Sequence, residues 1–409
     1  MIARSRRPEI HMRTALLALA VSLATPCAFA QADARAVQLA RDALIVDTHI
    51  DAPSQLVKTW ADIGVSAPDR EFDYPRARAG GLDVAFMSIY TSGGQDAAGT
   101  ARQSAHAQID AVEAAIARHP DKFAKLTSPG DVDRLRAGGK ILFALGMENG
   151  APIVDDLANL QVFFDRGVRY ITLTHGMNNR ISDSSYAIEK QWDGLSPFGE
   201  QVVAQMNRLG IMVDVSHLSD AAIRDTVRIA KAPVIASHSG LRRFTPGFER
   251  NLSDALLKAI AKTGGVVQLV FGNAFIDPAS AADTQAYFIA QAKFNADNLV
   301  RKQAGQPQLS VDAFDKEWDA AHPARPTDIS QVLDQVDHAR KVMGIDHIGI
   351  GSDFDGVSGN LPPQLKTVAD YPNFVAGLQS RGYSDADIRK VLGGNLMRVW
   401  QAVEDRAKR

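Results

Sequence analysis

The feature that most constrains the fold is a series of eight short apolar runs with helical patterns between them. Each run is a continuous apolar stretch with many β-branched residues, which is typical of strands buried on both faces of a parallel sheet. The eight runs span residues 43–49, 82–90, 141–147, 168–174, 210–216, 232–237, 264–271 and 347–352.

The segments between these runs carry helix start and stop signals. Residues 197–210 end on Gly210, residues 219–231 begin with Ser219 before an acidic first turn, and residues 328–344 also end on a glycine. Eight strands that alternate with helices predict an α/β fold, the (β/α)8 TIM barrel. An open doubly wound sheet is the alternative, but it gives no reason for polar residues at so many strand ends.

The gap between the seventh and eighth runs is the longest, at about 75 residues. Its first part, residues 273–303, has a helical and partly amphipathic pattern. We therefore expect a helical insertion before the eighth strand, which would act as a lid or an edge subdomain and not as a second domain.

The first 30 residues differ from the rest of the chain. Arginines precede the apolar run "TALLALAVSLA", and Ala28-Phe29-Ala30 fits a small-x-small cleavage site, so residues 1–30 are predicted to be a secretory signal peptide. The apolar run is short for a membrane anchor, and translation could begin at Met1 or at Met12. The mature chain, residues 31–409, is then expected to be a single domain in the periplasm or outside the cell. Its only cysteine, Cys27, would be removed, which excludes disulfides and thiolate ligands.

The charge balance limits the partners. The chain has 45 Lys and Arg against 47 Asp and Glu, and a formal net charge of −2, which argues against a nucleic acid or an anionic membrane surface. The C-terminus "QAVEDRAKR" is polar, so we expect no stable membrane anchor. The sequence leaves the oligomeric state open, a homodimer included.

Histidines and carboxylates stand at the ends of the predicted strands. In a (β/α)8 barrel the carboxyl ends of the strands form the active-site face, so these side chains should meet there. Nitrogen and oxygen ligands without sulfur suit a borderline or hard cation such as Zn²⁺. The strand ends carry His49, Asp51, Glu148, His175, His217, His238, Asp353 and Asp355.

The number of candidate ligands indicates two metal ions. A single catalytic zinc ion needs three protein ligands, and here there are five candidates. Two ions that share Glu148 as a bridging ligand would use all five. Any one residue could instead be an ordinary satisfied polar group, and Asp353 and Asp355 could be turn residues before Gly356. Their joint position at one end of successive strands favours a metal site. The five candidate ligands are His49, Asp51, Glu148, His217 and His238.

At these residues the sequence resembles the membrane (renal) dipeptidase family of zinc metallopeptidases, peptidase family M19, within the amidohydrolase-like barrels. The matching segments occur in family order across residues 47–356, and "GGNLMRVW" near the C-terminus resembles the closing helix of the family. The segments are "DTHID", "GMENG", "LTHGMNN", "DVSHLSD", "PVIASHSG", "RNLSD", "GGVVQLVF" and "GSDFDG".

The resemblance implies a role for each residue. His49 and Asp51 would hold one zinc ion, His217 and His238 the other, and Glu148 would bridge them. His175 would contact the substrate and its tetrahedral intermediate. Arg250 would bind the carboxylate of the substrate, for which a planar guanidinium is suited. Asp353 would be the acid–base residue.

The expected activity is the hydrolysis of dipeptides by a zinc-activated water. Alternatives are another hydrolase on the same barrel, such as a lactonase, phosphotriesterase or deaminase, or a non-catalytic periplasmic protein that binds metal or a ligand. The mammalian family members carry a lipid anchor and disulfides, whereas we expect neither in the mature chain. The insertion before the eighth strand leaves the preferred dipeptide open.

Overall fold

Eight parallel strands close into a barrel in the computed structural model, which describes residues 32–408. The predicted signal peptide at residues 1–30 lies outside the described residues. The strand order is β2-β1-β9-β8-β7-β6-β5-β4, and pairing of β2 with β4 closes the ring, so the predicted TIM barrel is confirmed. The strands are β1 (Ile45–Ile50), β2 (Leu82–Tyr90), β4 (Ile141–Glu148), β5 (Val168–Thr172), β6 (Met212–Asp214), β7 (Ile235–Ser239), β8 (Val266–Leu269) and β9 (Ile348–Ile350).

One further strand, β3 (Phe123–Lys125), pairs with the start of β4. The sequence did not predict it because three residues are too short to show a period.

Helices surround the barrel, and the predicted helix ends are confirmed. The Ser219 hydroxyl accepts a hydrogen bond from the amide of Ala222, and Gly210 adopts the left-handed conformation with φ of 79°. The helices are α1 (Ala34–Asp42), α2 (Ala52–Lys58), α3 (Tyr74–Gly80), α4 (Gly93–Ala98), α5 (Ala101–Arg118), α6 (Val132–Leu135), α7 (Ala158–Asp165), α8 (Pro197–Leu209), α9 (Asp220–Ile229), α10 (Asp254–Lys262), α11 (Pro278–Gln303), α12 (Val311–Ala321), α13 (Ile329–Met343), α14 (Tyr371–Ser380), α15 (Asp385–Arg389) and α16 (Asn395–Ala407).

The strand side chains form two apolar clusters, as expected for strands covered on both faces. One cluster fills the barrel with alternate strand residues such as Val84 and Phe86, and Trp400 of α16 packs into it. The other joins the outward residues, Ala85 and Met87 among them, to the helices. The interior cluster leaves the carboxyl ends of the strands free to carry polar side chains.

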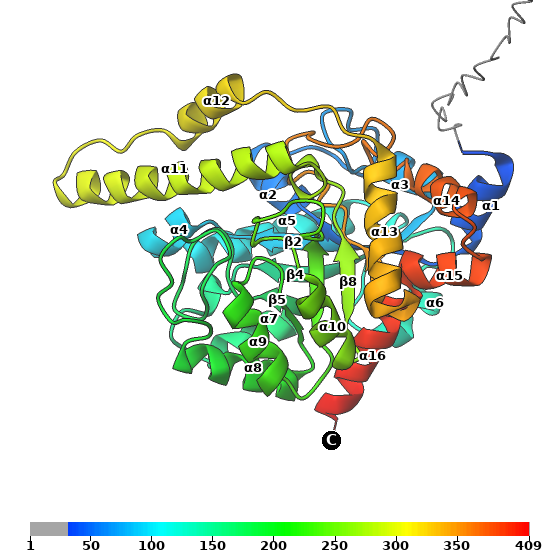
Figure 1. The fold of residues 1–409 in the computed structure, drawn as a ribbon, viewed down its shortest axis with the longest axis horizontal. Coiled ribbons are helices and arrows are strands. Elements are labelled where there is room, and N and C mark those ends of the chain that lie inside the picture. Colours follow the sequence, from blue (N-terminus) through cyan, green and yellow to red (C-terminus); the bar gives the residue numbers. More distant parts are fainter. Residues whose placement is uncertain (1–31, 409) are drawn as a thin grey trace, which may run out of the picture. The chain divides into compact units, whose positions relative to one another are not determined.

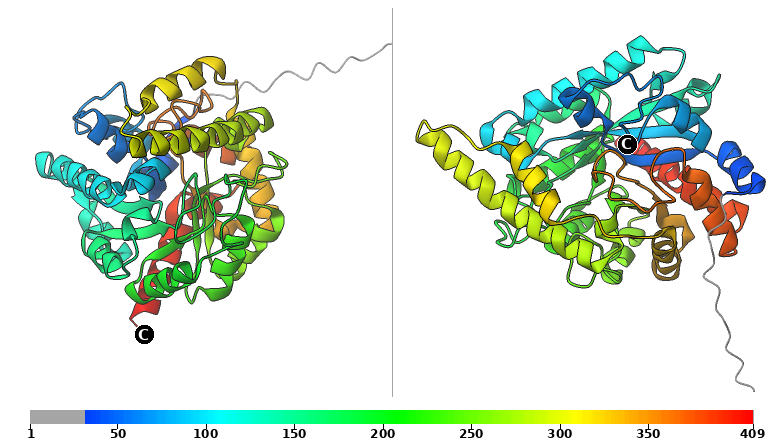
Figure 2. Two further views of the ribbon diagram at one scale, coloured as in Figure 1. Left: turned by 90° about the vertical axis from the view of Figure 1, so that its left-hand side faces the viewer. Right: turned by 90° about the horizontal axis from the view of Figure 1, so that it is seen from above.

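The insertion before the eighth strand of the barrel is helical, as predicted, and consists of α11 and α12. These helices lie at one end of the barrel and α16 lies at the other (Figure 1). Seen from above, they cross one side of that end (Figure 2). Only Ala281 of α11 is buried and no residue of α12 is, so the insertion contributes little to the core.

None of the helices within residues 32–408 combines the length and the apolarity needed to cross a bilayer.

Candidate active site

The predicted site residues converge at the carboxyl ends of the strands. His49 lies in β1, Glu148 ends β4 and His238 lies in β7. Asp51, His175, His217 and Asp353 follow the ends of their strands within three residues, whereas Arg250 lies in the loop after β7. All but His175 are at least nine-tenths buried as whole residues. Six of them line the inner part of a cavity of about 400 Å³, namely Asp51, Glu148, His175, His217, His238 and Asp353.

The Glu148 carboxylate stands between two groups of ligands. Its Oε2 lies 3.4 Å from His49 Nε2, and Asp51 Oδ2 lies 3.4 Å from the same nitrogen. Its other oxygen, Oε1, lies 3.0 Å from His217 Nε2 and 3.3 Å from His238 Nε2. His175 Nε2 is 3.6 Å from Oε1. Each carboxylate oxygen therefore faces a different set of imidazoles, which is the arrangement a bridging ligand requires.

A buried tyrosine fixes the tautomer of His49. The Tyr170 hydroxyl donates to the carbonyl of Thr48 at 2.9 Å, so towards His49 Nδ1, 2.8 Å away, it acts as an acceptor. The proton of His49 then lies on Nδ1, and the lone pair of Nε2 faces Asp51 and Glu148. Gly146 makes this possible, because a side chain at that position would collide with the Tyr170 ring.

A similar relay orients His238. The Ser237 hydroxyl donates to Asp214 Oδ2 at 2.6 Å and lies 2.8 Å from His238 Nδ1, so it accepts the proton of His238. Asp214 is fully buried and also accepts from the Thr172 hydroxyl and from the amides of Ser216 and Ser237. The Nε2 lone pair of His238 therefore points to Glu148.

The donor set fits divalent metal ions. His49 Nε2, which faces Asp51 and Glu148, is buried and has no hydrogen-bond partner among the described residues. Burial, with help from nearby positive charges, lowers the pKa of His217 and His238 well below the usual value, which keeps them in the neutral form that binds metal. Three triads have ligand atoms within 4.8 Å of one another. These are His49–Glu148–His238, Glu148–His175–His217 and His49–Asp51–Asp353.

The loop after β9 brings Asp353 against Asp51. Burial and the charge of Asp51 raise the pKa of Asp353 well above its usual range. The close approach depends on Gly356, because a side chain there would collide with both carboxylates. Asp353 and Asp355 both adopt the left-handed backbone region, with φ of 67° and 64°. Such conformations are strained for residues other than glycine and persist only when the surroundings hold them.

Glu71, in the loop before α3, holds this strained segment. Its amide donates to Asp355 Oδ1 at 2.7 Å, and its Oε2 accepts from the amide of Asp355. Burial raises the pKa of Glu71 to about 7 and that of Asp355 to about 6. Glu71 follows no predicted strand and belongs to no motif, so sequence reasoning had no signal for it.

Arg250 lies beside β7 and is 2% exposed. Its guanidinium donates to the Ser239 hydroxyl at 3.0 Å and to the carbonyl of His238 at 2.7 Å. No carboxylate within residues 32–408 lies within 4.0 Å of it, and it is not among the residues that line the cavity. The structure thus places Arg250 behind the cavity wall as a buried cation without a counter-ion. Its charge contributes to the lowered pKa of His217 and His238.

Comparison with known proteins gives the class of protein that this fold and site define. The family model described as membrane dipeptidase (peptidase family M19) matches residues 33–409, which is nearly the whole chain. The chain therefore belongs to the membrane dipeptidase family, a family of metallopeptidases, and the predicted resemblance is confirmed.

Solved structures support this assignment. The probable dipeptidase PvdM from Pseudomonas aeruginosa is 28% identical, with a TM-score of 0.76 over 91% of this chain and 98% of that one. A metallopeptidase from Rhodobacter sphaeroides, liganded with a phosphinate mimic of L-Ala-D-Ala, is 23% identical, with a TM-score of 0.71 over 88% and 99% of the two chains. An amidohydrolase from Pseudomonas aeruginosa is 22% identical, with a TM-score of 0.67 over 90% and 98%. The last two show the shared fold.

The relay behind His238 gives a first testable prediction. Replacing Ser237 with alanine removes the acceptor of the His238 proton, and we expect zinc affinity to fall by roughly 10- to 100-fold. Competition with a chromogenic chelator measures the affinity. Ser185→Ala is the matched control, because Ser185 is also buried but its hydroxyl has no partner among the described residues. Equal affinities in the Ser237 variant and the control would contradict the relay.

A second prediction concerns Glu71. Glu71→Ala removes the acceptor for the Asp355 amide, and we expect kcat to fall about tenfold or more while metal content stays normal, because Asp353 loses its support. Glu71→Gln keeps an acceptor oxygen and should restore most of the rate. Steady-state kinetics with metal analysis of both variants and of the exposed Glu189→Ala tests this. A Gln variant as slow as the Ala variant would show that the hydrogen bond is not what matters.

Proposed function

We propose that this protein hydrolyses the peptide bond of dipeptides at a site that holds two zinc ions. The observation that carries the proposal is the position of Glu148, whose two oxygens face separate groups of imidazoles at 3.0 to 3.4 Å. The probable dipeptidase of Pseudomonas aeruginosa and the dipeptide mimic in the Rhodobacter structure support a dipeptide as the substrate.

The residues present would divide between the two ions. His49 and Asp51 would hold one ion, His217 and His238 the other, and Glu148 would bridge them. When bound, the ions would lower the pKa of a shared water and polarise the peptide carbonyl. The set contains only nitrogen and oxygen donors, as zinc and similar cations accept.

Asp353 is suited to carry the proton. Its raised pKa favours the transfer of a proton to it from the attacking water, and it can then give this proton to the leaving amine. The loop after β9 places its carboxylate in the cavity lining, beside Asp51. Its left-handed backbone and the support from Glu71 fix that direction.

His175 and Arg250 would bind the substrate. Burial lowers the pKa of His175, so it is a neutral imidazole at the edge of the Glu148 group, where it would stabilise the oxyanion by hydrogen bonding. Arg250 is a buried cation without a carboxylate partner among the described residues, which favours a substrate carboxylate nearby. Since Arg250 does not line the cavity, part of its effect on the substrate carboxylate would pass through the residues that separate it from the cavity.

The N-terminal segment supports a location outside the cytoplasm. We propose that residues 1–30 direct the chain to the periplasm or out of the cell and are then removed, leaving residues 31–409 as a single domain. Cell fractionation and N-terminal sequencing of the mature chain would test this.

Metal analysis is the direct test of the proposed site. Purified protein should contain about two zinc equivalents per chain, and removal by a chelator should abolish hydrolysis of Ala-Ala until zinc is restored. Thermal stability should fall with the metal, because a ligand that binds only the folded state stabilises it. Full activity in metal-free protein would overturn the two-metal site.

The role of Asp353 gives a separate prediction. Asp353→Asn should retain both metal ions and bind substrate almost normally, while kcat falls by roughly 10²- to 10⁴-fold, the usual span for general acid–base catalysis. Single-turnover rates and metal stoichiometry, measured together, separate this role from that of a ligand in the His49–Asp51–Asp353 group. Loss of zinc in the variant would assign Asp353 to the metal instead.

A further inference from the structure

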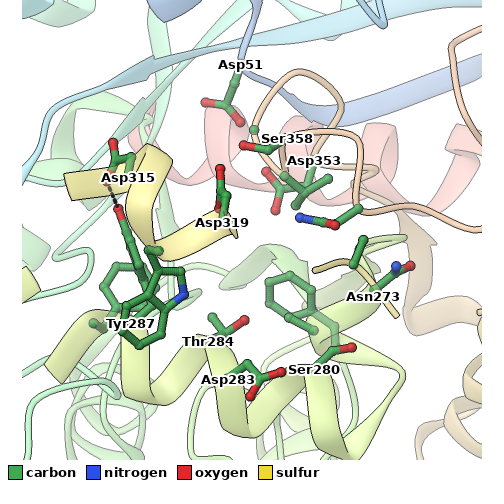
Figure 3. Close-up of a pocket in the computed structure, with 18 of the residues that line it drawn as sticks. Asp51, Asn273, Ser280, Asp283, Thr284, Tyr287, Asp315, Asp319, Asp353 and Ser358 are labelled. Carbon is green, nitrogen blue, oxygen red and sulfur yellow. Dashed lines mark hydrogen bonds between the residues drawn. The ribbon is translucent and has the colours of Figure 1, made fainter. Parts of the chain in front are cut away.

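The cavity continues beyond the proposed metal site to the insertion. Side chains of α11 and α12, among them Tyr287, Trp318 and Asp319, line its outer part. Figure 3 shows Asp319 extending from α12 into the cavity, on the side where Asp51 and Asp353 lie. A cavity of about 400 Å³ falls within the range of roughly 300–1,000 Å³ for pockets that enclose drug-sized ligands, so it has room for a dipeptide with a long side chain.

The outer wall is aromatic. The rings of Tyr287 and Trp318 meet edge to face with centroids 5.6 Å apart, and Trp318 stacks on His322 at 4.0 Å. Phe288 lies at the junction with the inner part, where it stacks on Tyr186 at 3.8 Å. Rings held in this way offer rigid apolar surface to the carbon chain of a substrate, and their faces attract cations.

The negative charges on the outer wall of the cavity are not all paired with positive charges. Two other acidic groups of the insertion are paired, since Asp312 binds Lys58 at 2.9 Å and Asp283 binds Arg325 at 2.8 Å, while Asp297 and Glu317 do not line the cavity. Asp315 and Asp319 have no Lys, Arg or His nitrogen within 4.0 Å in residues 32–408.

These two carboxylates also line the cavity from the same face of α12. They stand one turn apart, where like charges repel and weaken a helix. The Tyr287 hydroxyl donates a hydrogen bond to Asp315 at 2.8 Å and makes none to Asp319 (Figure 3). The helix therefore presents negative charge to the cavity.

The outer wall and the metal site belong to one electrostatic environment. Tyr90 also lines this cavity, and burial, followed by the charges of Glu148, Asp51 and Asp315 among others, raises its pKa. Because Asp51, Asp353, Asp315 and Asp319 all line one cavity, a substrate bound at the inner part can extend toward the outer carboxylates.

We propose that the α11–α12 wall is a subsite for a basic side chain, and that the preferred substrates are dipeptides containing lysine or arginine. Aromatic rings accommodate the methylene chain, and Asp319 with Asp315 binds the cationic end. The inference rests on the proposed dipeptidase function and names its substrate class.

A panel of dipeptides separates this inference from the proposed function. Lysine is compared with norleucine, which has the same carbon chain without the charge, in Lys-Ala against Nle-Ala and in Ala-Lys against Ala-Nle. For at least one pair we expect kcat/KM to be about tenfold or more higher with lysine, and the corresponding glutamate dipeptide to be slower than both. Cleavage of Ala-Ala and the norleucine dipeptides without any lysine advantage overturns the subsite alone. Failure to cleave any dipeptide overturns the function itself.

Charge-removing variants on α12 locate the effect. Asp319→Asn should reduce the lysine advantage, measured as the ratio of kcat/KM for the lysine and norleucine dipeptides, at least about fivefold, and an unchanged thermal unfolding midpoint would show that the variant is folded. Asp312→Asn is the matched control, because it removes the same charge from the same helix at a residue that pairs with Lys58 and does not line the cavity. An equal loss in both variants would mean that the net charge of the insertion, and not the subsite, sets the preference.

Discussion

The site is organised around one buried carboxylate, Glu148, at the end of β4. A charge at this depth is costly unless it is compensated, and His49 and His238 turn Nε2 lone pairs toward it, so bound cations would supply the compensation. The strands that carry these histidines must end at one level of the barrel for the arrangement to exist.

A few buried polar side chains connect the core of the barrel to the site at the carboxyl ends of the strands. Tyr170 belongs to the apolar cluster inside the barrel, while its hydroxyl joins Thr48 to His49. Asp214 ends β6 and gathers four donors, so it is stable without a cation and still directs His238 through Ser237. The same side chains thus pack the barrel and choose the tautomers, which makes the geometry of the site a consequence of the fold.

Local patterns in the sequence were enough to predict the strands and the position of the site. The eight barrel strands were visible as apolar runs, and the polar residues after them could be placed at one end because parallel strands share a direction. The relays through Tyr170 and Ser237 were not visible, since they depend on which side chains meet across the barrel. Neither was the support that Glu71 gives to Asp355, which joins residues 284 positions apart. The position of Arg250 behind the lining is likewise a product of tertiary packing that its motif does not reveal.

The insertion is packed less tightly against the rest of the fold than the strand ends that carry the site. α11 and α12 bury little in the core, and their contacts with the rest of the chain include the ion pair Lys58–Asp312 and the small apolar cluster in which Ala281 and Phe288 meet Tyr186. Side chains on α12 that face the cavity can therefore change without a penalty in core packing, because no apolar contact of the barrel depends on them. The histidines and Glu148 have no such freedom, since each is buried against the others. Chemistry that requires fixed distances lies on the strand ends, and selectivity that must fit a particular substrate lies on the segment whose packing constrains it least.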